Sequence, residues 1–155
     1  MSIRCKALVA RIVLIASIWL GGCMFSIPID ISGQWVGMLE YTSGPAAGFL
    51  FPFTLDVIFA HNDLTGTITL PSHGTFTFEL PLNSGRAKNP NIRFEAFGTN
   101  PNLDPPPTVS ITMEGTYDAD SMSGEGSQTV DGATYEFVWE ASFVPPPDPP
   151  AGENQ

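Results

Sequence analysis

Two stretches of strict alternation decide the fold class. Residues 109–117 read VSITMEGTY, and residues 133–143 read ATYEFVWEASF. In both stretches an apolar or small residue occupies every second position, and most positions between them hold Ser, Thr or Glu. Because successive side chains of a β-strand point to opposite faces, this period of two predicts strands with one apolar and one polar face.

The same alternation extends outward over most of the chain. With the two stretches above, it predicts eight strands between residues 31 and 144, of which the one over residues 122–130 is the weakest. The remaining five centre on residues 35–41, 51–59, 64–70, 76–80 and 92–96. No stretch shows the spacing of an amphipathic helix. The sequence therefore predicts an all-β protein.

Short connections with turn-forming residues favour antiparallel pairing of successive strands. The expected fold is an eight-stranded up-and-down meander that closes into a barrel, because closure leaves no strand edge unpaired. A β-sandwich is the alternative, and it would need long crossovers at residues 42–48, 83–91 and 99–107. Arg86 and Lys88 are expected to be solvated cations of a long loop, and contact with an anionic group is the alternative.

A short repeat of an apolar residue, a polar residue and glycine supports the barrel. Glycine inside a strand marks a sharp bend or a close approach of backbones, and a narrow barrel needs such points. The repeat begins at Ile31, Leu64, Met113 and Met122.

The first residues have the layout of a secretory signal, a basic stretch followed by a short apolar run. Leu20-Gly-Gly-Cys23 resembles a bacterial lipobox, and this resemblance implies that Cys23 is acylated and becomes the first mature residue. The alternative is an ordinary signal with an incidental cysteine. The resemblance also implies a cell-envelope location, with the outer membrane favoured because Met24 is not the Asp that retains lipoproteins in an inner membrane.

The expected organisation has four parts. Residues 1–22 form a lipoprotein signal peptide, 23–30 a lipidated tether, 31–144 the β-barrel domain and 145–155 a disordered proline-rich tail. The tail is partly polyproline II, and a recognition peptide for a partner is its alternative role. A chain of 155 residues has room for one such domain.

Charge excludes one class of partner. The chain holds 6 Lys and Arg against 16 Asp and Glu, for a net charge of −10. A nucleic-acid binder needs a basic footprint, so no nucleic-acid partner is expected. Removal of residues 1–22 would leave three basic residues and a charge of about −13, with no free cysteine for a disulfide or a thiolate metal site.

Two short motifs carry a resemblance to a fold family. Gly33-Gln34-Trp35 is similar to the Gly-x-Trp opening of lipocalins and their calycin relatives, which include avidin-like proteins, and residues 63–67, DLTGT, resemble the corresponding avidin hairpin. The resemblance implies a barrel in which Trp35 closes one end. It does not imply biotin as the ligand, because only Trp35 and Trp139 remain in the mature chain and avidins use more.

The apolar face of the strands is the candidate ligand site. The interior of an eight-stranded barrel is either filled by side chains or holds one small ligand. The many phenylalanines on this face, Phe76 among them, favour filling, whereas Gly37, Gly66 and Ala96 favour space, so both outcomes stay open. The residues expected to line a ligand are Trp35, Phe53, Phe78, Phe94, Phe137 and Trp139.

Turn structure explains the other candidate residues. His61 and His73 have no third ligand for zinc. The carboxylates of Asp118 and Asp120 supply oxygen ligands of the kind that Ca²⁺ prefers, but the residues after them do not match an EF-hand loop. No metal and no cofactor is expected.

These observations predict a non-enzymatic, membrane-anchored protein that buries a small apolar molecule. The alternative is a solid-core lipoprotein with a structural or protein-interaction role, for which no particular protein partner is predicted.

Overall fold

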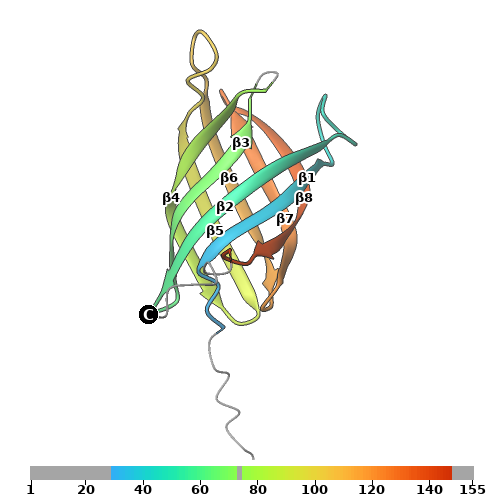
Figure 1. Cartoon of the computed structure of the whole chain (residues 1–155). Helices are drawn as coiled ribbons and strands as arrows, with labels where there is room; N and C mark the ends of the chain where they lie inside the picture. The colour runs from blue at the N-terminus through green and yellow to red at the C-terminus, as the bar shows by residue number, and fades with distance from the viewer. Residues whose placement is uncertain (1–28, 73–74, 148–155) are drawn as a thin grey trace, which may run out of the picture.

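The computed structural model describes residues 29–72 and 75–147, and it is an antiparallel barrel (Figure 1). Its strands pair in the order β1-β2-β3-β4-β5-β6-β7-β8 and close. The bounds are β1 Gly33–Tyr41, β2 Leu50–Ala60, β3 Asp63–Pro71, β4 Thr77–Lys88, β5 Asn91–Thr99, β6 Thr108–Tyr117, β7 Ser121–Val130 and β8 Ala133–Val144. The meander barrel predicted from the alternation is confirmed, and the sandwich alternative is wrong.

Closure depends on β1, which pairs with β2 on one side and with β8 on the other. The seam with β8 runs from Gln34 opposite Val144 to Tyr41 opposite Phe137. Because every strand has two neighbours, no edge is left to pair with another chain.

The two ends of the barrel differ (Figure 1). One end, here called the base, carries the start of β1 and the short turns at residues 61–62, 89–90 and 118–120. The other end, here called the mouth, carries the longer connections at residues 42–49 and 100–107, the β3–β4 connection and the turn at residues 131–132. The described chain begins and ends at the base.

Two of the turns have the backbone that tight hairpins require. His61 and Asn62 both have positive φ, at 54° and 74°, and so do Asp131 and Gly132, at 47° and 87°. Two-residue hairpins prefer this geometry because it matches the right-handed twist of the strands. His61 is therefore an exposed turn residue, as the sequence predicts.

The long loop expected at residues 83–91 is wrong. β4 continues to Lys88, and only Asn89 and Pro90 separate it from β5. The pairing of β4 with β5 shifts between Leu82 and Ser84. This bulge moves the inward positions from even to odd numbers, so Leu82 and Ala87 face the same side. A prediction that assumes a fixed period of two therefore ends the strand at the bulge, although β4 continues beyond it.

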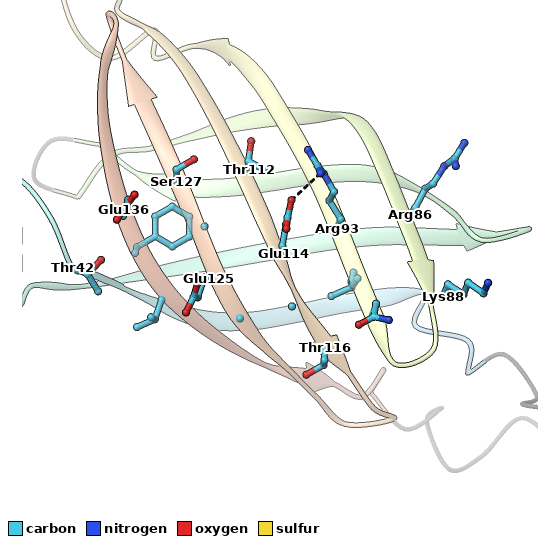
Figure 2. A pocket seen from close by; sticks show the side chains of 17 residues that line it. Thr42, Arg86, Lys88, Arg93, Thr112, Glu114, Thr116, Glu125, Ser127 and Glu136 are labelled. Atoms are coloured by element: carbon cyan, nitrogen blue, oxygen red, sulfur yellow. Dashed lines mark ion pairs between the residues drawn. The ribbon is translucent and has the colours of Figure 1, made fainter.

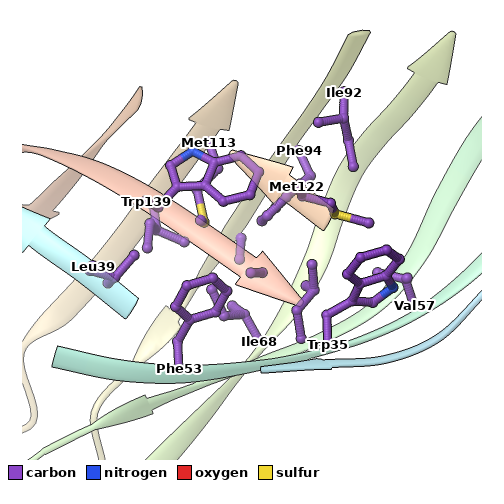
Figure 3. Packing of buried hydrophobic residues seen from close by; sticks show 14 of the residues in the cluster. Trp35, Leu39, Phe53, Val57, Ile68, Ile92, Phe94, Met113, Met122 and Trp139 are labelled. Carbon is purple, nitrogen blue, oxygen red and sulfur yellow. The ribbon is translucent and has the colours of Figure 1, made fainter. Parts of the chain in front are cut away.

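Buried hydrophobic side chains pack against one another inside the barrel (Figure 3). At the base Trp35 is 0% exposed, its Nε1 donates to the carbonyl oxygen of Ile31 at 3.0 Å, and its ring meets Phe143 edge to face. Trp35 thus lies at the closed end, where the resemblance to lipocalins places it. In the middle Trp139 packs between Phe53 and Phe94, with ring centroids 6.5 and 6.2 Å away.

Three glycines of the repeat, Gly66, Gly115 and Gly124, lie where backbones approach closely, whereas Gly33 lies against the ring of Phe143. Gly115 of β6 faces Gly124 of β7, and a Cβ atom on Gly124 would lie 2.6 Å from the Cα of Gly115. Gly66 has a φ of 146°, and the carbonyl oxygen of Asp56 occupies the place of its missing side chain. Both sites exclude any larger residue, which agrees with the bends expected from the sequence.

The signal peptide, Cys23, most of the tether and the proline-rich tail from residue 148 onward lie outside the described residues. In the two described ranges no helix is long and apolar enough to cross a bilayer.

Candidate functional site

The structure buries all six residues predicted to line a ligand. They contribute to one hydrophobic core, and the most exposed of them is Phe78 at 5%. Their neighbours are mostly one another and other core side chains. Contact between any of these six and a ligand stays a prediction.

Small residues on the inner face leave less space than their size suggests. A Cβ atom on Gly37 would lie 2.5 Å from the ring of Phe53, and one on Gly126 would lie 2.5 Å from the ring of Phe137. The aromatic rings therefore occupy the volume that these glycines leave. In the described structure, the barrel interior below the mouth is a packed core.

A cavity of about 310 Å³ lies at the mouth, above this core. It falls at the lower end of the roughly 300–1,000 Å³ that small-molecule sites occupy. Its walls are mostly apolar and include two tyrosines and one amide. The lining residues are Leu39, Tyr41, Pro45, Ala46, Phe51, Leu70, Pro71, Gln128, Val130 and Tyr135.

The connection between β1 and β2 folds over one side of the cavity. The backbone N–H of Thr42 donates to the carbonyl of Glu136 at 2.8 Å, and that of Glu136 donates to Ser43 Oγ at 2.7 Å. Gly44, with a φ of 75°, lies against the ring of Tyr135. These contacts to β8 place Pro45 and Ala46 at the cavity.

The other connections at the mouth are joined by an amide. Asn100 is 5% exposed, and its Nδ2 donates to Ser72 Oγ at 2.8 Å, which links the end of β5 to the end of β3. Asn102 Nδ2 donates to the carbonyl of Thr77 at 2.8 Å. These hydrogen bonds join the connections at the mouth to one another.

The mouth also carries exposed apolar side chains. Phe49 and Leu50 are 63% and 60% exposed, and Phe76 and Leu103 are 63% and 43% exposed. The expectation that Phe76 belongs to the inner face is wrong, because it precedes β4 and lies in the connection at the mouth. These four residues, here called the apolar rim, lie at the mouth end of the barrel, and none of them lines the cavity.

Gln128 is the polar residue of the site that the sequence analysis missed. It lies on β7 in phase with the inward-facing Met122 and Val130, and opposite Ile111 and Tyr135. The Tyr41 hydroxyl donates a hydrogen bond to Gln128 Oε1. The sequence does place the amide of Gln128 among the alternating inward positions of this strand. The glycines at positions 124 and 126 made the alternation too weak to identify those positions as inward-facing.

Burial raises the pKa of Tyr41 to about 12. The phenol therefore stays neutral at physiological pH and keeps its proton for Gln128. The unfolded chain ionises this group from about pH 10, so the folded state should lose stability as the pH rises from about 10 to about 12. Chemical denaturation in that window should show a smaller loss in Tyr41→Phe than in the unchanged protein. An equal loss in both proteins would show that Tyr41 is not the group responsible.

A second hollow, of about 1030 Å³, lies on the outer face of β4 to β8 (Figure 2). It collects the three basic residues of the described chain, Arg86, Lys88 and Arg93, which lie on strands and not in a loop. Arg93 is already paired, with Glu95 at 2.8 Å and Glu114 at 2.9 Å. The hollow is lined by charged side chains of both signs, whereas no residue lining the mouth cavity is charged.

The remaining polar candidates do not form a site. His61 lies at the base, at the opposite end of β3 from Ser72, and His73 lies outside the described residues. Hydrogen bonds from the backbone N–H groups of Asp120 and Ser121 hold the pKa of Asp118 below its ordinary value. No cluster of three or more His, Cys, Asp or Glu side chains suited to a metal ion occurs within residues 29–72 and 75–147.

The order and pairing of the strands are consistent with a lipocalin- or calycin-like barrel. Comparison of the chain with protein-family models and with curated proteins finds no match.

Proposed function

We propose that this protein is a lipid-anchored, non-enzymatic binding protein that holds a small apolar molecule at the mouth of its barrel. The observation that carries the proposal is the mouth cavity, which combines mostly apolar walls with a polar pair at Gln128 and Tyr41. Small-molecule sites have this composition, because apolar burial supplies affinity and a few polar groups fix orientation.

The apolar rim supports the same function. Phe49, Leu50, Phe76 and Leu103 expose apolar surface at the same end of the barrel as the cavity. Exposed apolar surface gathered at one place on a protein marks a binding site more often than scattered residues do. A ligand that enters the cavity would cross this surface while leaving water.

A tryptophan at position 46 should block the cavity. Ala46 lines it, half-buried in the connection between β1 and β2. In Ala46→Trp the indole would occupy space that a ligand needs, and we expect binding of the small neutral fluorophore 1-naphthylamine to weaken by about tenfold or more, equivalent to about 1.4 kcal/mol. The measurement is the increase in fluorescence when the fluorophore is titrated into the protein.

The matched control is Ala47→Trp. Ala47 is the next residue, is exposed and does not line the cavity. This variant adds the same side chain to the same connection and should bind the fluorophore as the unchanged protein does. Equal binding by both variants, or no binding by any of the three proteins, would refute the proposal.

The lipid anchor rests on the lipobox at residues 20–23. Since the described chain starts at the base, an anchor at Cys23 would turn the base toward the membrane and the mouth away from it. The six residue-to-residue steps from Cys23 to Ile29 span at most about 20 Å when fully extended. Cells expressing the protein should incorporate labelled palmitate into it and not into Cys23→Ala. Equal labelling of both proteins, or none in either, would exclude the anchor.

A further inference from the structure

We propose that the ligand is a neutral molecule with an apolar body and one hydrogen-bond acceptor, such as a ketone, ester or amide, and that the side-chain amide of Gln128 donates to it. This inference rests on the proposed function and names the chemical class of its ligand.

The mouth cavity has hydrogen-bond donors that can meet a ligand. The single hydroxyl proton of Tyr41 is used on Gln128 Oε1. This bond turns the amide so that its other atom, Nε2, is available, and Nε2 has no protein acceptor among the described residues. An amide nitrogen carries two N–H donors and no acceptor. The cavity therefore offers donors to a ligand from an otherwise mostly apolar wall.

The residues that line the mouth cavity favour an uncharged ligand. No residue lining the mouth cavity carries a charge. The basic residues of the described chain line the hollow on the outer face, and Arg86 pairs with Asp63 at the start of β3, near the base. A carboxylate or an ammonium group in the cavity would lose water without gaining an opposite charge, which is costly. A neutral acceptor meets the donors of Gln128 without that cost.

The volume of the mouth cavity sets the size of the ligand. At about 30 Å³ for each water-sized group, the cavity has room for about ten nonhydrogen atoms. Two probes of this size with nearly equal apolar chains are 2-nonanone, a neutral acceptor, and nonanoate, an anion above about pH 6. Their comparison isolates the polar end of the ligand.

The test is calorimetric titration of the purified full-length protein with each probe at about pH 8. We expect 2-nonanone to bind at least tenfold more tightly than nonanoate. Gln128→Leu, which keeps the size of the side chain and removes the donors, should weaken 2-nonanone binding by about fivefold to tenfold. Ser127→Ala, its neighbour on the outer face of β7, should leave binding unchanged, and circular dichroism should show all three proteins folded.

Each alternative outcome overturns a different statement. If nonanoate binds as tightly as 2-nonanone, or if Gln128→Leu binds 2-nonanone unchanged, the inference about ligand class is wrong and the binding function stands. If neither probe binds to the folded protein and the fluorophore does not bind either, both the inference and the proposed function fail.

Discussion

Trp139→Ala is expected to lower the free energy of unfolding by about 3–5 kcal/mol, the range for removal of a large aromatic side chain from a core. Trp139 is 3% exposed and packs against Phe53 and Phe94 in the middle of the barrel. Its Nε1 also donates to the carbonyl of Glu125 at 3.1 Å, so the substitution removes the donor for that carbonyl. Alanine would leave a cavity that these rings cannot close without moving the strands that carry them.

The measurement is urea denaturation followed by far-ultraviolet circular dichroism. The matched control is Val138→Ala, because Val138 is the preceding residue on β8, faces outward and is 39% exposed. Exposed substitutions away from special features usually change stability by about 0.5 kcal/mol or less. A loss for Trp139→Ala no larger than that of Val138→Ala would mean that the interior is not packed as described.

Gly124→Val is expected to be still more disruptive, with a loss of about 4 kcal/mol or more. A Cβ atom at position 124 would meet the backbone of β6, since it would lie 2.6 Å from the Cα of Gly115 and closer to the carbonyl oxygen of Glu114. Backbone atoms cannot turn aside as a flexible side chain can. Relief of the clash would require separation of β6 from β7, which would open the barrel.

The same denaturation experiment with Ser123→Val provides the control. Ser123 is the preceding residue on β7 and is exposed, so valine there adds only outward-facing bulk with a good β-propensity. We expect this variant to be as stable as the unchanged protein or slightly more stable. Tolerance of Gly124→Val would contradict the close approach of β6 and β7.

The barrel could be predicted from sequence because its strands are amphipathic and its connections are short. Period-two alternation at residues 109–117 and 133–143 is strong enough to identify strands by itself, and a meander follows from tight turns such as Asp131-Gly132. The second half of β4 was not predicted from the sequence, and the reason is local. A bulge near Ser84 changes which positions face inward, and alternation with a fixed phase cannot follow this change.

The site was less accessible to prediction than the fold. The alternation identifies inward-facing residues but does not say at which height of the barrel packing ends and a cavity begins. That depends on ring positions such as Phe137 beneath Tyr41, whose ring centroids are 5.7 Å apart. It also depends on the fold of the connection that brings Ala46 over the mouth. The six residues were predicted to line a ligand because they are aromatic. Inward-facing aromatic side chains also fill a core, as these six do.

Amide NMR spectra of isotopically labelled protein titrated with 2-nonanone would show whether an apolar ligand binds at the mouth of the barrel. We expect the shifts to concentrate at Tyr41, Ala46 and Tyr135 and at the side-chain amide of Gln128, with little change at Arg93 on the outer face. Shifts confined to the hollow on the outer face, or no shifts at the mouth at concentrations that saturate the calorimetric titration, would contradict binding at the mouth.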